Sequence, residues 1–175
     1  DTVEVASQFN EFWMDYPPFL KKLTSHVDTG DDLDTETIGK IVESGKFMAG
    51  NGVLGQLVLA KTDMSAHQFY AVAGGGDNRS PFDMEQDIIA TTRVMPSLPG
   101  DSFLHSITHL FAGGYAAGLY SYKWAEVMAA DAFSAFEEVG LDNAEGVREV
   151  AQRFEDTVLS LGGSKPAAET YRLFR

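Results

Sequence analysis

The 175-residue sequence contains no cysteine. Disulfide-stapled scaffolds and thiolate metal sites are therefore excluded, and any bound metal would need histidine or carboxylate ligands. The sequence also lacks an apolar run of the roughly 20 residues that a membrane-spanning helix requires. It shows no alternation of apolar and polar residues of the kind that is typical of a half-buried strand. We therefore expect neither membrane insertion nor a β fold.

Basic residues are scarce, with 13 Lys and Arg against 26 Asp and Glu, which gives a formal net charge of −13. Proteins that bind nucleic acids draw most of their affinity from basic side chains that contact phosphates. Anionic membrane surfaces attract basic side chains for the same reason. The acidic balance therefore argues against both partners, and its simplest consequence is solubility.

The sequence begins at Asp1 without an initiator methionine, and it lacks the basic start of a secretory signal peptide. We expect a processed, trimmed or partly sequenced product. A cytoplasmic location is predicted, or, for a eukaryotic protein, the plastid stroma or mitochondrial matrix after removal of a transit peptide.

Apolar residues recur with helical spacing, which predicts an all-α fold in a single domain over residues 1–175. The first helix is predicted over residues 2–16, where two prolines stop it. A long helix is predicted over residues 116–139. The glycine-rich segment 74–81 predicts the clearest loop.

The most metal-like feature is the segment His105-Ser-Ile-Thr-His109. Two histidines four residues apart lie on one face of a helix and can share a divalent ion. In peptidases with the H-E-x-x-H motif, a glutamate general base follows the first histidine, whereas Ser106 stands there in this chain. A metal site and a structural or substrate-contacting role are both open at this point.

A run of small and aromatic residues follows this pair. Gly113 and Gly114 allow a backbone or a bound peptide to approach closely. Tyr115 and Tyr122 are seven residues apart, or two helical turns, so we expect them to share a helix face. A phenol can donate a hydrogen bond to an oxyanion, although aromatic residues at this spacing are also ordinary core residues.

Two carboxylates, Glu4 and Glu11, are likewise seven residues apart on the first predicted helix. Such a pair suits metal ligation or acid–base chemistry, and a solvated acidic face is the alternative. Phe9 and Trp13 indicate that much of this helix is buried. A buried carboxylate needs a hydrogen-bonding partner or a metal ion.

These residues carry a resemblance to a known family. The segments 103–127 and 130–138 closely resemble the sequence near the C-terminus of the thimet oligopeptidase and oligopeptidase A family of zinc metallopeptidases. Residues 3–13, Val-Glu-Val-Ala-Ser-Gln-Phe-Asn-Glu-Phe-Trp, resemble the V-E-x-P-S-Q-x-x-E-x-W segment of that family. Residues 161–164 and 171–175 are similar to its closing region. The resemblance covers nearly the whole chain in order and is closest to the oligopeptidase A branch, with its bacterial and plant organellar members.

The resemblance implies the helical C-terminal part of a catalytic domain that hydrolyses short peptides in a deep channel with one zinc ion. It implies that Glu4 is the third zinc ligand. The two histidine ligands belong to an H-E-x-x-H motif that the family places before residue 1, so this chain alone would not catalyse the reaction. The pair His105 and His109 is then not the zinc pair.

The resemblance also implies roles for the residues around the glycine pair. Tyr122 and Tyr115 match catalytic tyrosines that bind the substrate and stabilise the tetrahedral intermediate. His109 matches a histidine near the substrate. Gly113 and Gly114 match a flexible turn that lies along the bound peptide.

The chain departs from the family pattern at a few positions near these residues, none of which is a matched catalytic residue: Ala6, Asn10, Phe12 and Leu119. Three functions are therefore compared. The chain is the C-terminal part of a zinc oligopeptidase that obtains its histidines from the missing N-terminal part of the same protein or from a partner chain. Alternatively, it is a non-catalytic helical subunit with a structural or interaction role in a larger assembly. The third function is a new metal site at His105 and His109.

Overall fold

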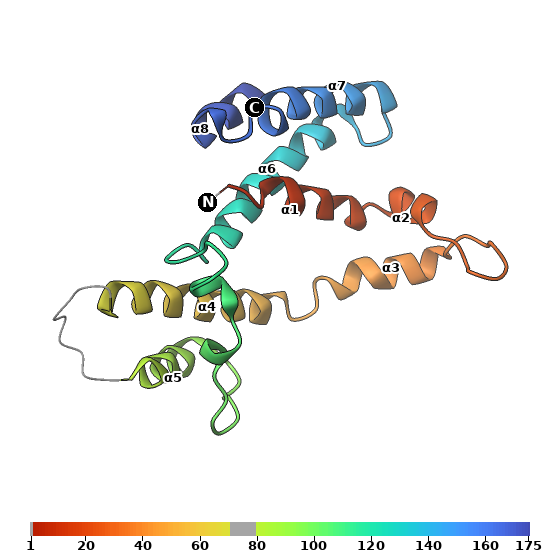
Figure 1. Ribbon diagram of the computed structural model, residues 1–175. Coiled ribbons are helices and arrows are strands. Elements are labelled where there is room, and N and C mark those ends of the chain that lie inside the picture. Colours follow the sequence, from red (N-terminus) through yellow and green to blue (C-terminus); the bar gives the residue numbers. More distant parts are fainter. Residues whose placement is uncertain (1, 71–79) are drawn as a thin grey trace. The chain divides into compact units, whose positions relative to one another are not determined.

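The computed structural model describes residues 2–70 and 80–175 (Figure 1). These residues form helices and turns and contain no strand, so the all-α prediction is confirmed. Most of the loop predicted over residues 74–81 lies outside the described residues. No helix in the described ranges is long and apolar enough to cross a membrane.

The chain divides into two compact units, which we describe one at a time. Unit 1 comprises Asp1–Val42 and Trp124–Arg175, and unit 2 comprises Glu43–Lys123. The single domain expected over the whole chain stays a prediction.

Unit 1 is built from six helices or parts of helices, of which α3 and α6 extend past its boundaries. They are α1 (Val5–Glu11), α2 (Pro17–Leu23), α3 (Thr35–Ser44), α6 (Ser121–Val139), α7 (Ala144–Phe154) and α8 (Ala167–Phe174). The first helix is shorter than predicted, because a 3-10 turn over Phe12–Asp15 replaces its last turn. Pro17 then occupies the first position of α2, where its missing N–H is not needed.

The core of unit 1 forms where α1 lies across α6 (Figure 1). Val5 and Phe9, four residues apart, share the buried face of α1. The facing part of α6 carries three alanines with no exposed surface, which let the two helices approach closely. They are Ala125, Ala129 and Ala132. The Phe9 ring lies 5.1 Å from that of Phe136 in α6 and 4.9 Å from that of Phe154 in α7. This packing fixes the direction in which the N-terminal end of α1 points.

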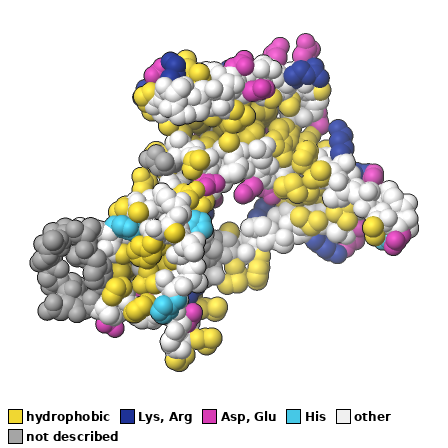
Figure 2. Space-filling model, viewed as in Figure 1, with side chains coloured by type: hydrophobic (Ala, Val, Ile, Leu, Met, Phe, Trp, Pro, Cys, Tyr) yellow, Lys and Arg dark blue, Asp and Glu magenta, His cyan; other side chains and the backbone are white. Residues whose placement is uncertain are grey.

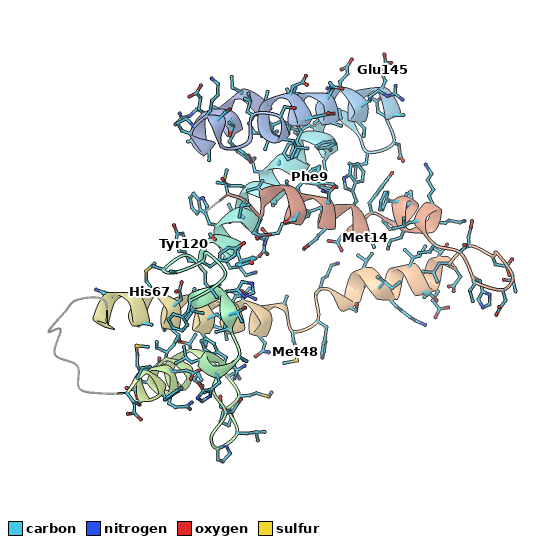
Figure 3. All side chains as sticks on the ribbon, in the orientation of Figure 1. Phe9, Met14, Met48, His67, Tyr120 and Glu145 are labelled. Atoms are coloured by element: carbon cyan, nitrogen blue, oxygen red, sulfur yellow. The ribbon has the colours of Figure 1, made fainter. Side chains whose placement is uncertain are left out.

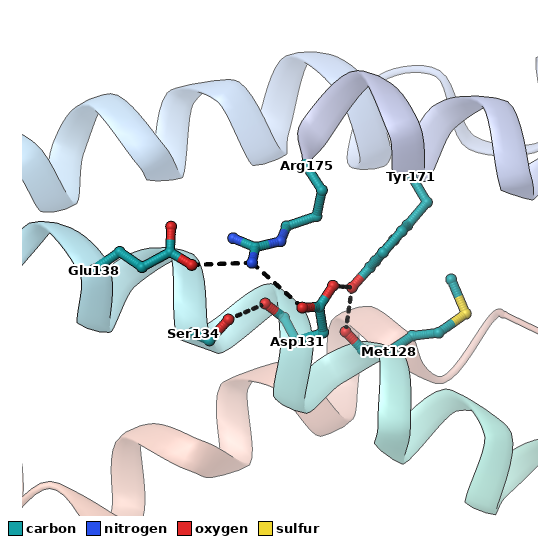
Figure 4. Close-up of polar contacts among 6 residues, drawn as sticks. All are labelled: Met128, Asp131, Ser134, Glu138, Tyr171 and Arg175. Atoms are coloured by element: carbon teal, nitrogen blue, oxygen red, sulfur yellow. Dashed lines mark hydrogen bonds and ion pairs between the residues drawn. The ribbon is translucent and has the colours of Figure 1, made fainter.

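Polar contacts fasten α8 to α6 (Figure 4). The Tyr171 hydroxyl has two acceptors for its one proton, the Met128 carbonyl at 2.8 Å and the Asp131 carboxylate at 2.7 Å. Arg175 lies 3.3 Å from Asp131 and donates to Glu138 at 3.0 Å. Burial, followed by the contact with Asp131, raises the pKa of Tyr171. The phenol therefore stays protonated and keeps donating.

Unit 2 contains the paired helices α4 (Ala49–Tyr70) and α5 (Pro81–Thr92), followed by two 3-10 turns over Phe103–His105 and Thr108–Leu110. Ser80 begins α5 in a capping box with Asp83. Val58 of α4 and Ile89 of α5 are buried. Apolar side chains are also visible on the surface of the molecule in Figure 2.

One pH-dependent prediction arises at the start of α3. The Asp34 carboxylate accepts hydrogen bonds from the Thr37 hydroxyl at 2.7 Å and from the Thr37 amide at 2.9 Å. These bonds, the hydroxyl first, lower the pKa of Asp34. The stabilisation of α3 is therefore complete above the ordinary aspartate pKa of about 4 and is lost as the pH falls through the lower pKa of the folded state.

The Thr37 amide resonance in NMR spectra should thus shift as the pH falls below about 4. The variant Asp34→Asn should remove this shift, because an amide does not titrate. A Thr37 resonance that stays constant as the pH falls would contradict the hydrogen bonds from Thr37 to the Asp34 carboxylate.

Candidate functional site

Glu4 lies immediately before α1, with φ −83° and ψ −5°. Its Oε2 accepts a hydrogen bond from the Ser7 hydroxyl at 2.9 Å, and its carbonyl lies 2.9 Å from the same hydroxyl. Ser7 therefore orients the carboxylate, while the buried Val5 holds the helix end. Glu4 is half-buried, whereas Glu11 at the other end of α1 is exposed. The solvated-face alternative thus fits Glu11, whereas the metal-ligand role of Glu4 stays a prediction.

The segment that contains His105 and His109 is not a continuous helix, so the predicted shared helix face is wrong. His105 ends the first 3-10 turn and His109 lies in the second, with Ile107 between them in an extended conformation at φ −86° and ψ 104°. His105 stacks on Phe82 with ring centroids 4.6 Å apart. The helical spacing that suggested a metal-binding pair is therefore absent.

His109 instead joins the two predicted tyrosines in unit 2. The Tyr115 and Tyr122 rings stack with centroids 5.1 Å apart and planes at 24°. The His109 ring lies 5.5 Å from that of Tyr115 and 6.3 Å from that of Tyr122. We call these three residues the tyrosine cluster. The structure thus brings together three residues that the sequence assigned to one site.

The tyrosines meet for a different reason from the one predicted. The long helix does not begin at residue 116 but at Ser121, so Tyr122 lies in its first turn and Tyr115 lies before it. Ala117 has a φ of +53°, which is incompatible with a right-handed helix. A compact turn, and not a common helix face, therefore places the two rings against each other.

The two glycines close this turn. A Cβ at Gly113 would lie 2.8 Å from the His109 Cα, and Gly114 has a φ of +80°. The Tyr115 amide then donates to the His109 carbonyl at 3.3 Å. The close approach that the sequence predicted here is thus made, at least in part, by the chain's own backbone.

The variant Gly113→Ala should therefore disturb the turn. The added methyl group meets the backbone, which cannot rotate away, so we expect a loss of about 1–3 kcal/mol in the free energy of unfolding. A thermal or denaturant unfolding curve measures this loss. The control is Gly52→Ala, because Gly52 lies inside α4 with no atom within 4 Å of a new Cβ. That change should be neutral or stabilising by up to about 1 kcal/mol, and equal stability of the two variants would contradict the close approach at Gly113.

Sequence reasoning missed a buried carboxylate under this turn. Asp63 of α4 is only 1% exposed, and its two oxygens accept hydrogen bonds from the amides of Ala117 and Leu119, each at 2.9 Å. His67, one turn further along α4, places Nδ1 3.0 Å from the same carboxylate. One signal was available, because an acidic residue inside a long apolar helix needs a buried partner.

Glu85 of α5 is a second such carboxylate and has no exposed surface. It accepts a hydrogen bond from the Phe103 amide at 2.9 Å and another from the Ser102 hydroxyl. It therefore anchors the entry to the first 3-10 turn. This contact lies at the other end of the 103–119 segment from Asp63.

The described residues contain no group of three or more His, Asp or Glu side chains that could hold a metal ion. A catalytic zinc site in a peptidase uses three protein ligands, so Glu4 alone does not form one. Glu4 belongs to unit 1 and the tyrosine cluster to unit 2. What the cluster offers chemically is two phenol donors and an imidazole beside a glycine turn.

Comparison with known proteins agrees with the resemblance seen in the sequence. Residues 1–175 match the sequence model of peptidase family M3. Organellar oligopeptidase A, chloroplastic/mitochondrial, from Arabidopsis thaliana is 46% identical over the whole chain, which covers 22% of that protein. Probable cytosolic oligopeptidase A from the same plant is 44% identical, with 24% of it covered. Oligopeptidase A of Escherichia coli K12 is 38% identical, with 25% covered. The chain thus spans about a quarter of the length of these relatives.

Proposed function

Because the chain belongs to peptidase family M3 over residues 1–175, we propose that it supplies part of the active site of a zinc-dependent oligopeptidase that hydrolyses short peptides. The observation that carries this proposal is the tyrosine cluster. Its three rings come from three different local segments, and the sequence resemblance assigned all three to substrate contact.

The tyrosine cluster is suited to a peptide bond under attack. A phenol hydroxyl donates a hydrogen bond without bringing a net charge. Tyr122 is the donor to the oxyanion of the tetrahedral intermediate, and the stacked Tyr115 ring limits its rotation. Such preorganised donors lower the barrier because they need not reorient during the reaction. His109 and the turn of Gly113 and Gly114 form the neighbouring wall for the substrate.

Glu4 is the zinc ligand that this chain contributes, with Ser7 orienting its carboxylate. The two histidine ligands come from outside residues 1–175, in the rest of the same protein or in a partner chain. A zinc ion bound in such a site would supply Lewis-acid chemistry, polarising the substrate carbonyl and lowering the pKa of a bound water.

The surface of α4 supports the proposal that more protein packs on this chain. Val53, Leu57 and Met64 are each about two-fifths exposed on this helix, at 41%, 40% and 42%. Groups of exposed apolar side chains commonly mark interaction surfaces. For location, we propose the cytoplasm or an organelle, because the similar plant proteins are named for both.

A peptidase assay on the full-length gene product tests the proposal. We expect cleavage of a short quenched-fluorescence peptide, loss of this activity with 1,10-phenanthroline, and recovery after zinc is added. A zinc-loaded protein that cleaves no peptide would overturn the proposal. A folded protein with neither zinc nor activity would instead favour the non-catalytic subunit.

A further inference from the structure

We propose that Asp63 is a positioning residue for the tyrosine cluster. Its carboxylate holds the turn between Tyr115 and Tyr122 in the geometry that catalysis requires. The catalytic consequence of this inference rests on the proposed function. The geometric part concerns unit 2 alone and does not depend on catalysis.

The Asp63 carboxylate binds the turn through two hydrogen bonds. One oxygen accepts from the Ala117 amide and the other from the Leu119 amide, each at 2.9 Å. Hydrogen bonds to an ionised acceptor are stronger than those between neutral groups. Ala117 lies two residues after Tyr115, and Leu119 lies three residues before Tyr122. A change in these two hydrogen bonds would therefore move one ring relative to the other.

The two hydrogen bonds to Asp63 also explain the unusual backbone conformation of Ala117. Ala117 has a φ of +53°, a region that residues with a Cβ rarely occupy without compensation. The compensation comes from Asp63, which accepts hydrogen bonds from the Ala117 amide itself and from the Leu119 amide. The Tyr115 carbonyl accepts from the Gly118 amide at 2.7 Å, which tightens the same turn.

His67 completes the surroundings of the carboxylate. Its Nδ1 lies 3.0 Å from an Asp63 carboxylate oxygen and 2.9 Å from the Asp63 carbonyl, and its side chain is 26% exposed. Figure 3 labels His67 on α4. A buried carboxylate without partners is strongly unfavourable. Asp63 contacts three partners, two of which belong to the turn that carries the tyrosine cluster.

The variant Asp63→Asn in the full-length protein separates a positioning role from a merely structural one. Asparagine keeps the shape but turns one acceptor into a donor that faces an amide N–H. Glu85→Gln is the matched control, because Glu85 is also a buried carboxylate of unit 2 that accepts from a backbone amide. It anchors Phe103 and not the turn at Ala117.

Two readouts are needed. In hydrogen–deuterium exchange, the amides of residues 117–119 should exchange at least about 10-fold faster in Asp63→Asn than in the wild type, and Glu85→Gln should keep the wild-type rate there. In the peptidase assay well below the melting temperatures, Asp63→Asn should lower kcat by about 10–100-fold with a smaller change in KM. Glu85→Gln should retain kcat.

If the amides of residues 117–119 exchange in Asp63→Asn at the same rate as in the wild type, the inference is overturned. An equal loss of kcat in Asp63→Asn and Glu85→Gln overturns it as well. If Asp63→Asn does not fold, the wild type still decides, because the amides of Ala117 and Leu119 should be protected although they lie outside any helix. Unprotected amides there overturn the inference. A wild-type protein that cleaves no peptide but shows this protection counts against the proposed function. It still supports the geometric part of the inference, that Asp63 holds the turn.

Discussion

In the full-length protein, the variant Glu4→Gln should lose its bound zinc and its peptidase activity together. The amide of glutamine keeps the size of the side chain but removes the negative charge that zinc requires of this ligand. Changes that only affect partners of the ligands already cost about 10–100-fold in metal affinity. Loss of a direct ligand should therefore lower zinc affinity by more than about 100-fold, which metal analysis after dialysis against a zinc buffer measures.

Glu11, at the other end of α1 from Glu4, provides the control for the Glu4→Gln experiment. Glu11 ends α1, is exposed, and lies seven residues from Glu4. The variant Glu11→Gln removes the same charge at the other end of α1 and should keep both zinc and activity. One zinc per chain and an unchanged kcat in Glu4→Gln would show that Glu4 is not a ligand, whatever the activity of the wild type.

The variant Tyr122→Phe should lower kcat by about 10²–10³-fold, which is the usual effect of losing one donor to an oxyanion. The phenylalanine ring can still stack on Tyr115, so the tyrosine cluster should keep its packing. The lost hydroxyl acts mainly in the transition state, so KM should change much less than kcat. Steady-state kinetics with one short peptide provides both values.

Tyr120 is the matched control, two residues away and 42% exposed (Figure 3). The variant Tyr120→Phe makes the same chemical change outside the tyrosine cluster and should leave kcat within about twofold of the wild type. A Tyr122→Phe enzyme with a raised KM and an unchanged kcat would assign Tyr122 to substrate binding alone. Equal losses in the two variants would remove the special role of Tyr122.

Much of unit 1 could be predicted from local pattern. Val5 and Phe9 are four residues apart, and the alanines of α6 recur at intervals of three and four, so both buried faces follow from helical spacing. The end of α1 was placed too late, because a 3-10 turn over Phe12–Asp15 has nearly the same periodicity over one turn as an α-helix.

The segment of unit 2 that carries the tyrosine cluster was predicted with the wrong backbone, and the roles of its residues stay predictions. Helical spacing suggested one face for His105 and His109 and another for Tyr115 and Tyr122. Gly113 and Gly114 signalled a turn, but nothing about an alanine signals a positive φ at residue 117. The residue that holds this turn, Asp63, is 54 positions away from Ala117 in the sequence. Local pattern carries no information about such a contact.

The affinity of a phosphinic peptide, whose tetrahedral phosphinyl group imitates the transition state, tests the central claim most directly. Because a transition-state analogue reports on the interactions that lower the barrier, Tyr122→Phe should weaken its binding to the full-length protein by the same factor as kcat/KM. The predicted factor is about 10²–10³, with the affinity for the cleaved product peptides nearly unchanged. Equal affinity of wild type and Tyr122→Phe for the phosphinic peptide, measured by calorimetry, would contradict the assignment of the tyrosine cluster to catalysis.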